Sequence, residues 1–415
     1  MNHLTEKFAL SPANILLPKN IDMAKWSVVA CDQYTSEPEY WDRVKNFVGD
    51  SPSTLNLILP ETYLNGNTAP LIEKINAAMN QYLTKNLFEE YKNSYIYAER
   101  TLSSGKTRKG LIAAIDLERY DFSPNSKSTV RATEGTILER IPPRKRVRIN
   151  APLELPHIML LIDDKDKKII EGLQAKKIDF KKAYDFELME KGGHIAGWAI
   201  GADQIDLYEP FSALAKNAME RETPLIFALG DGNHSLATAK DCWEDIKKTL
   251  SAEEIAVHPA RFALAEIVNI HDESLEFEPI HRVLFNVNAG DLLTKLREFY
   301  PVVSDGGGHI VDYVSKEKSG HIVLPTSASN LAVGALQKFL DHYLRESSAE
   351  IDYVHGDDVV RELGAKDGNI GFLLPKMEKS DLFKTVVLDG ALPRKTFSMG
   401  HAEEKRFYLE CKRIR

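Results

Sequence analysis

The sequence feature that most constrains the fold is a strand, turn and helix pattern over residues 224–250, PLIFALGDGNHSLATAKDCWEDIKKTL. The apolar run that ends at Leu229 predicts a buried strand. After the turn, apolar residues recur every three or four positions and predict one face of a helix, namely Leu236, Ala239, Trp243, Ile246 and Leu250. The pattern therefore predicts a sharp turn, residues 230–235, between two regular elements.

The backbone of this turn is suited to an anion. Gly230 and Gly232 let the chain bend sharply and approach a ligand closely. Asn233 or Ser235 can cap the following helix, whose first N–H groups and positive end then face the turn. A phosphate or a carboxylate binds readily at such a place.

Two side chains of the turn can carry chemistry. Asp231 can hold a metal ion or accept a proton, and His234 can titrate near neutral pH. An ordinary strand-to-helix turn with a good cap uses the same residue types, so the spacing alone leaves both interpretations open.

The elements around this turn are mixed. Residues 71–91 predict an amphipathic helix, residues 94–102 and 107–117 predict a β-hairpin about a Ser-Gly turn, and a helix is expected around 133–141. This order predicts an α+β fold with mixed sheets and flanking helices. No linker divides the chain, so we expect either an N-terminal α+β lobe over 1–165 and a C-terminal α+β lobe over 166–415 that carries the turn, or one large domain.

Composition excludes some classes of protein. A hydrophobic content of 43% excludes a disordered or collagen-like chain, and the net charge of −8 weighs against a protein that binds nucleic acid through a global positive field. The three cysteines, Cys31, Cys242 and Cys411, form no C-x-x-C motif. Together with the lack of a long apolar stretch, they predict a cytoplasmic protein that does not span a membrane.

Three segments carry a resemblance to a known family. GDGNHSLATA, the upstream ATEGTILER and the downstream HPARFALAEIVNIHDESLEFEPIHRVLF are similar to the domain of unknown function 1015 family, over nearly the whole chain. The central motif of that family, D-G-H-H-R, resembles the signature of the ParB/sulfiredoxin-like fold, in which the matching loop binds nucleotide phosphates in a free serine kinase. The resemblance implies a core of that fold.

The central motif is only partly kept. Asp231, Gly232 and His234 follow the family pattern, whereas Asn233 and Ser235 stand where His and Arg are usual. A hydroxyl cannot replace the bidentate phosphate contact of a guanidinium. The resemblance therefore implies either that another basic residue supplies the charge or that the ligand differs.

Five basic residues are candidates for that charge or for direct phosphate contact. Arg261 lies in HPAR, the pair His281 and Arg282 resembles the downstream His-Arg pair of the family, and Arg394 and Lys395 lie in a segment rich in donors. Solvated, core or loop positions would explain each of them equally well.

Upstream, Glu134 lies in a segment that resembles the His-Glu-x-Thr segment of the family, with Arg131 in the place of His. This resemblance makes Glu134 a candidate base or metal ligand. Thr133 and Thr136 could equally be helix-start residues. The nearby basic run over 140–148 lacks aromatic residues for base stacking, and we expect a solvated or internally paired face there.

The leading hypothesis is a nucleotide- or phosphate-dependent enzyme that transfers a phosphoryl group to a small hydroxylated metabolite, such as serine, or hydrolyses a bond near it. Asp231, His234 and Glu134 are the expected catalytic residues, and Asp231 or Glu134 would hold Mg2+. A non-catalytic sensor of an anionic metabolite is the alternative, and a nucleic-acid-binding protein is a weaker one. A homo-oligomer is expected only as a base rate.

Overall fold

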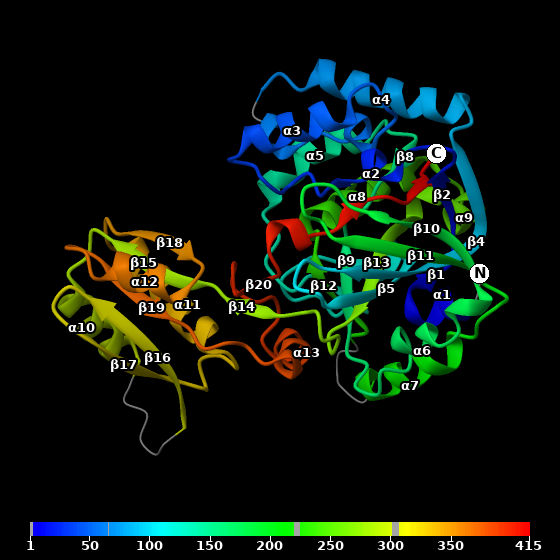
Figure 1. Ribbon diagram of the computed structural model, residues 1–415. Coiled ribbons are helices and arrows are strands. Elements are labelled where there is room, and N and C mark those ends of the chain that lie inside the picture. Colours follow the sequence, from blue (N-terminus) through cyan, green and yellow to red (C-terminus); the bar gives the residue numbers. More distant parts are fainter. Residues whose placement is uncertain (1–2, 65, 220–224, 301–306) are drawn as a thin grey trace. The chain divides into compact units, whose positions relative to one another are not determined.

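The structure is a computed structural model that describes residues 3–64, 66–219, 225–300 and 307–415 (Figure 1). The chain divides into two compact units. Unit 1 comprises residues 1–132, 136–275 and 401–415, and unit 2 comprises residues 133–135 and 276–400.

This division differs from a boundary at residue 165, which lies inside unit 1. The physical reason is strand pairing between distant segments. Strand β22 (Cys411–Arg413) pairs with β2 (Ala13–Pro18), and β21 (Phe407–Tyr408) pairs with β3 (Val28–Val29). Unit 2 is therefore an insertion between segments of unit 1.

Unit 1 is built on a mixed sheet, which confirms the α+β fold class. In the described residues this sheet has thirteen strands, and the pairs β13–β9, β12–β7 and β6–β7 are parallel. Besides β2 and β22, its strands are β1 (Leu10–Ser11), β4 (Phe88–Thr101), β5 (Thr107–Asp116), β6 (Tyr120–Asp121), β7 (Val130–Arg131), β8 (Leu153–Glu154), β9 (Met159–Ile162), β10 (Lys181–Glu187), β11 (His194–Gly201), β12 (Phe227–Asp231) and β13 (Phe262–Asn269).

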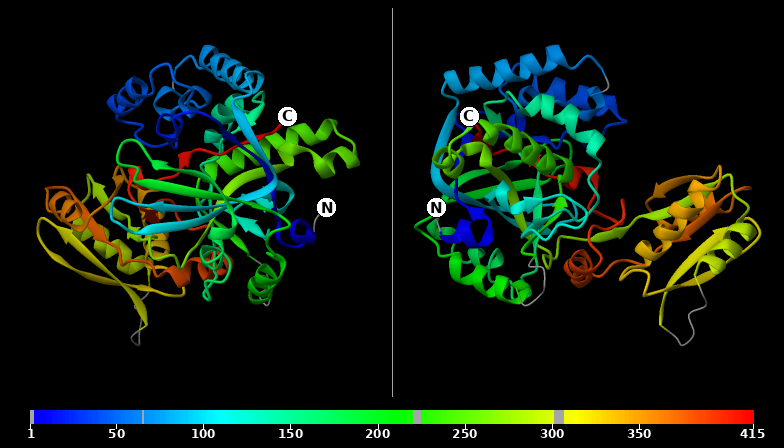
Figure 2. Two further views of the ribbon diagram at one scale, coloured as in Figure 1. Left: turned by 45° about the vertical axis from the view of Figure 1, so that its right-hand side comes forward. Right: turned by 180° about the vertical axis from the view of Figure 1, so that it is seen from behind.

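Helices cover this sheet on two sides. In Figures 1 and 2, α3 (Pro38–Val48), α4 (Ala69–Thr84) and α5 (Ile141–Arg148) lie on one side, and α1 (His3–Phe8), α6 (Glu171–Gln174) and α7 (Tyr208–Met219) lie on the other. Helix α8 (Asn233–Ile246) directly follows β12, and α9 (Ala252–Val257) follows it. In the described residues, no helix combines the length and the apolar composition needed to cross a membrane.

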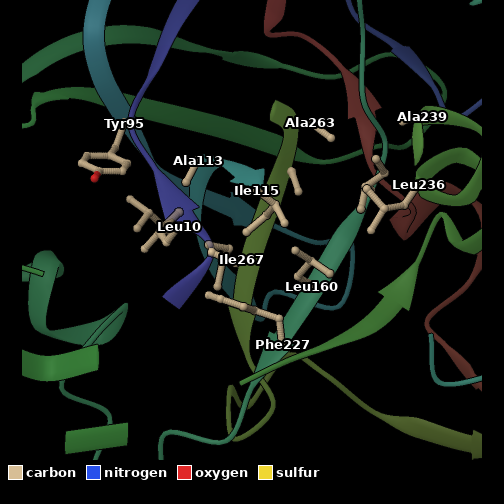
Figure 3. Close-up of a cluster of buried hydrophobic side chains, with 14 of the residues drawn as sticks. Leu10, Tyr95, Ala113, Ile115, Leu160, Phe227, Leu236, Ala239, Ala263 and Ile267 are labelled. Carbon is tan, nitrogen blue, oxygen red and sulfur yellow. The ribbon is translucent and has the colours of Figure 1, made fainter. Parts of the chain in front are cut away.

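The core of unit 1 fixes α8 against the sheet. Leu236 and Ala239 of α8 belong to the same buried cluster as Leu160 of β9 and Ala263 of β13 (Figure 3). The predicted helix face is therefore confirmed at Leu236, Ala239 and Trp243, which are buried. Since Leu236 and Ala239 lie in the first two turns of the helix, the start of α8 has a defined position at the end of β12.

Two of the expected elements differ in extent. The predicted hairpin is confirmed by β4 and β5, but the helix expected over 71–91 ends at Thr84 because β4 begins at Phe88. The helix expected around 133–141 is wrong. Glu134 forms a β-bridge with Leu392, and α5 begins only at Ile141, because Pro142 and Pro143 are tolerated in a first helical turn and not in a helix interior.

Unit 2 has its own antiparallel sheet, in the order β17–β16–β19–β15–β18. These strands are β15 (His281–Phe285), β16 (Gly308–Ser315), β17 (Ser319–Pro325), β18 (Glu350–Val354) and β19 (Ile370–Leu373), and a separate ribbon pairs β14 (Phe277–Pro279) with β20 (Phe397–Met399). Its helices are α10 (Ala289–Phe299), α11 (Ala332–Arg345), α12 (Asp357–Gly364) and α13 (Lys379–Leu388).

Candidate functional site

The turn between β12 and α8 starts its helix with a glycine. Gly232 is the N-cap residue and has φ 76°, and Asn233 and Ser235 already lie inside the helix, so the expectation that Asn233 or Ser235 caps it is wrong. The first backbone hydrogen bond of the helix runs from the N–H of Leu236 to the carbonyl oxygen of Gly232, at 3.0 Å. The three N–H groups before it therefore have no carbonyl four residues earlier within the helix.

Glycine is required at position 232. A β-carbon there would lie 2.9 Å from Cα of Ile158, in addition to the cost of the left-handed conformation. The backbone of the turn thus passes close to the segment before β9. Gly232 is buried, whereas Asp231, His234 and Ser235 are partly exposed, so the side chains of the turn remain accessible.

Asp231 is held as a carboxylate. Its Oδ1 accepts the N–H of Gly232 at 2.8 Å, and Nζ of Lys405 lies 3.3 Å from its Oδ2. Burial opposes ionisation, but Lys405, His157 and the N–H of Gly232 together outweigh it and lower the pKa of Asp231. Asp231 and Lys405 therefore form an ion pair at the turn, and Lys405 supplies a positive charge next to the helix start.

The main chain around Lys405 is fixed by two buried arginines. Arg100, which is 3% exposed, donates to the carbonyls of Glu403 and Lys405, each at 2.5 Å, and to that of Gly192. Arg108 donates to the carbonyl of Glu404 at 3.0 Å. Because consecutive carbonyls converge on these guanidinium groups, Lys405 projects from a rigid segment.

Ser235 contacts a buried histidine. Its Oγ lies 3.1 Å from Nε2 of His157, which is 5% exposed. Nδ1 of His157 lies 2.7 Å from the hydroxyl of Tyr408, and Oδ2 of Asp32 lies 3.8 Å from Nε2. The segment before β9, strand β21 and the loop after β3 thus bring three side chains, His157, Tyr408 and Asp32, close to the first turn of α8.

His234 is a neutral imidazole. Its Nε2 accepts the N–H of Ile137 at 3.2 Å, so the proton of the neutral ring is on Nδ1. Burial, together with the positive charges of Arg144 and Arg140, lowers the pKa of His234 to about 4. At neutral pH this residue can donate a hydrogen bond from Nδ1, whereas its Nε2 is already in use.

Arg261 lies away from this turn. Its Nε and Nη2 donate to the carboxylate of Asp116 at 2.8 and 2.6 Å. Asp231 of β12 and Glu266 of β13 both pair with Met159 of β9, so the two residues lie at the same level of the sheet. Phe262, the residue after Arg261, lies about 13 Å from Glu266 along β13. The structure therefore does not bring Arg261 together with the turn.

The other predicted cations and Glu134 belong to unit 2. Arg282 is fully buried, donates to Oε1 of Gln337 and donates to the carbonyls of Ile280, Arg394 and Lys395. Most of its N–H donors are therefore used within the protein, and they hold the 394–395 loop in place.

The remaining unit 2 residues have different surroundings. His281 is buried, with Nδ1 accepting the N–H of Leu374 and Nε2 3.0 Å from Asp357. The side chains of Arg394 and Lys395 are exposed. Glu134 lies near enough to Arg282 to influence its charge. The predicted residues thus divide into those at the turn of unit 1, Arg261 elsewhere in unit 1, and those of unit 2.

The basic run on α5 is paired internally, as expected. Lys145 contacts Asp241 and Asp245 of α8 at 2.6 and 2.5 Å, Arg144 pairs with Glu61, and Arg148 pairs with Glu154. These pairs attach α5 to its neighbours. They also hold Arg144 near enough to His234 for its charge to lower the pKa of that histidine, an interaction that the sequence did not reveal.

The residues that sequence reasoning missed are Asp32, His157, Lys405 and Tyr408. They come from distant parts of the chain, and no common spacing links them to the turn. In the part of the chain that the structure describes, no three His, Cys, Asp or Glu side chains gather as a metal site.

Comparison with solved structures gives remote similarity. A mutant free serine kinase in complex with AMP has a TM-score of 0.40 and 11% identity, covering 74% of this chain and 92% of that one. SbnI with a C-terminal truncation, from Staphylococcus aureus, has a TM-score of 0.37 and 6% identity, covering 70% and 82%. A conserved hypothetical protein from Pyrococcus furiosus has a TM-score of 0.35 and 11% identity, covering 72% and 90%. Similarity at this level carries no argument about ligand or activity, and the ParB/sulfiredoxin-like core stays a prediction.

Family membership rests on the sequence match. No curated protein matches this chain. The family model described as protein of unknown function (DUF1015) covers residues 12–354, which is most of the chain. This chain, with its glycine turn, Asp231 and His234 inside the matched range, therefore belongs to the DUF1015 family.

Proposed function

We propose that unit 1 binds the phosphate group of a nucleotide, or of another phosphorylated small molecule, at the first turn of α8 and transfers it to a small hydroxylated acceptor. The observation that carries this proposal is the partly exposed start of a fourteen-residue helix, with a glycine as its N-cap residue and Lys405 beside it. Backbone N–H groups and the helix dipole favour an anion there, and the ammonium group adds a full positive charge.

Lys405 also supplies the positive charge that is lost because Ser235 stands where the family usually has an arginine. The family motif usually has an arginine at that position, and here a lysine from a distant segment lies next to the same turn. A lysine acts as a point charge toward phosphate and does not form a bidentate pair. The proposed phosphate contact therefore uses the N–H groups of residues 233–235 for direction and Lys405 for charge.

Magnesium would enter with the nucleotide. Asp231 is ionised and partly exposed, and it is our candidate ligand for the ion in unit 1. Glu134, the other candidate from the sequence, belongs to unit 2. The bound ion would neutralise charge on the phosphates. His234, with its proton on Nδ1, would donate to a phosphate oxygen rather than act as a base.

Isothermal titration calorimetry tests this proposal. ATP, ADP and CTP are titrated with and without Mg2+ into the full chain and into Asp231→Ala and His234→Ala. We expect saturable binding of at least one nucleotide to the wild type and weaker binding to both variants. Absence of binding to the wild type under all conditions would overturn the proposal.

A sensor is the second candidate, and the state of His234 favours it. Its pKa of about 4 and its bond to Ile137 remove it as a base at neutral pH. A sensor would show saturable binding of a phosphorylated or carboxylated metabolite without turnover. Product analysis by chromatography after incubation with nucleotide and serine separates the two functions.

A further inference from the structure

Ser235 and His157 form a pair whose role the proposed function leaves open. Ser235 is the third residue of α8 and is partly exposed, and its Oγ lies 3.1 Å from Nε2 of a histidine that is almost fully buried. A hydroxyl within reach of an imidazole that is itself held by a third group is the arrangement of an activated nucleophile.

The third group is Tyr408. Its hydroxyl lies 2.7 Å from Nδ1 of His157 and accepts the backbone N–H of Cys31 at 3.2 Å, and the two rings meet edge to face at 5.5 Å. In the tautomer whose Nδ1–H donates to the tyrosine oxygen, Nε2 carries no proton and can accept that of Ser235. The phenol proton then points to the side chain of Cys31, which also contacts this hydroxyl.

Tyr408 and Cys31, the two groups beyond Nδ1 of His157, stay neutral. Burial raises the pKa of the Tyr408 phenol and raises the pKa of the Cys31 thiol to about 12. The carboxylate of Asp32, 3.8 Å from Nε2, would stabilise the imidazolium that forms when His157 takes a proton. The surroundings of His157 therefore suit a base that is oriented by Tyr408 and supported by Asp32.

We infer that Ser235 is a covalent phosphoryl acceptor and that His157 is its general base. This inference rests on the proposed function and specifies a two-step transfer. Oγ of Ser235 attacks the terminal phosphorus of the nucleotide, its proton passes to Nε2 of His157, and the bond between that phosphorus and the bridging oxygen breaks as the shortened nucleotide leaves. His157 then gives its proton to the departing oxygen.

The second step regenerates the enzyme. The hydroxyl of the acceptor, or water, gives its proton to His157 and attacks the phosphoserine, and the bond from Oγ to phosphorus breaks as Oγ regains a proton. The N–H groups at the helix start face the charge that develops on the phosphoryl oxygens. Ser235, which stands where the family usually has an arginine, would thus serve as the phosphoryl acceptor.

The test is a single-turnover labelling experiment on the full chain. The protein is mixed with ATP or ADP and Mg2+, quenched in acid and digested, and phosphorylated peptides are identified by mass spectrometry. We expect phosphoserine at position 235 in the wild type and none there in Ser235→Ala. We expect His157→Gln to slow labelling by about 100-fold or more, the usual contribution of a general base.

Two further variants separate chemistry from folding. Tyr408→Phe keeps the ring and removes the hydroxyl, and it should slow labelling by about five- to tenfold, as for the loss of one hydrogen bond. Ser251→Ala removes the N-cap serine of α9, which has no histidine partner among its cap contacts, and should leave labelling unchanged. The labelling rate in Tyr408→Phe is compared with that of the wild type even if His157→Gln does not fold.

The outcomes distinguish this inference from the function on which it rests. Nucleotide binding by calorimetry without phosphoserine at position 235, or phosphoryl transfer that persists in Ser235→Ala, overturns the covalent step and leaves the binding proposal standing. Absence of nucleotide binding overturns both.

Discussion

The ammonium group of Lys405 lies 3.3 Å from Oδ2 of Asp231, although residues 276–400 between them form a separate unit. The pair places one positive and one negative group at the start of α8. Its charges balance in the free protein, and an incoming phosphate adds negative charge that Lys405 can share.

The first prediction concerns Lys405. Lys405→Met should weaken nucleotide binding by about 10- to 100-fold, because a charge-assisted hydrogen bond to phosphate is lost. Calorimetry at two salt concentrations should also show a smaller salt dependence. Lys318→Met, a change in the β16–β17 turn of unit 2, is the control. Equal affinities for Lys405→Met and the wild type would restrict Lys405 to a role in stabilising Asp231.

A second prediction compares two glycines in the left-handed region. Gly105→Ala has open space for its β-carbon and should cost about 1 kcal/mol for its φ of 80° alone. Gly232→Ala has a similar φ and would also meet Ile158 backbone at 2.9 Å. Urea denaturation should therefore show a larger loss for Gly232→Ala, by about 1–3 kcal/mol. Equal losses would mean that the turn can move away from Ile158.

The third prediction is the titration of His234. Its pKa in the folded chain is about 4, below the ordinary value of 6.5, so the unfolded chain binds the proton first. The stability that this residue contributes is full above pH 6.5 and is lost as the pH falls toward 4. NMR should follow the titration directly. In Arg144→Met the pKa should rise, while remaining below 6.5 because burial is the largest cause. An ordinary pKa in the wild type would contradict this environment.

The fourth prediction concerns the arginine that fixes the segment of Lys405. Arg100→Met removes the buried donor to the carbonyl of Gly192 and the partly buried donors to those of Glu403 and Lys405, and should destabilise the chain by about 3–5 kcal/mol. Arg43→Met removes an exposed pair with Glu190 and should leave the denaturation midpoint unchanged. A similar midpoint for both variants would show that water or neighbouring groups replace Arg100.

The fifth prediction separates two arginines of unit 2 that were both expected to bind an anion. Arg282→Met removes the hydrogen bonds to Gln337 and to the 394–395 loop. It should lower the free energy of unfolding by about 2–4 kcal/mol, measured by chemical denaturation. Arg394→Ala changes an exposed side chain and should cost nothing measurable. A stable Arg282→Met variant with weakened nucleotide binding would instead restore Arg282 as a ligand contact.

Local patterns were predictable from the sequence. The strand, glycine turn and helix over 224–250 form β12 and α8, since period and turn chemistry act within a few residues. The helix expected around 133–141 failed because a distant partner, Leu392, pairs with Glu134 as a bridge, and tertiary pairing outweighs local propensity.

The site itself was predictable only in part. Asp231 and His234 could be named because they lie within the turn. Lys405, His157 and Tyr408 could not, because their contacts with the turn depend on strand pairings between segments far apart in the chain. The predicted N-cap was wrong because the helix begins earlier than expected: Gly232 is the N-cap residue, and Asn233 and Ser235 lie inside the helix.

The insertion of unit 2 has a consequence for biosynthesis. A ribosome makes the β12–α8 turn well before it makes Lys405 and Tyr408, because the whole stretch from 276 to 400 is translated in between. A nascent chain therefore exposes the start of α8 before Lys405 and Tyr408 exist, and a product shortened before residue 401 would keep the turn but lack both residues.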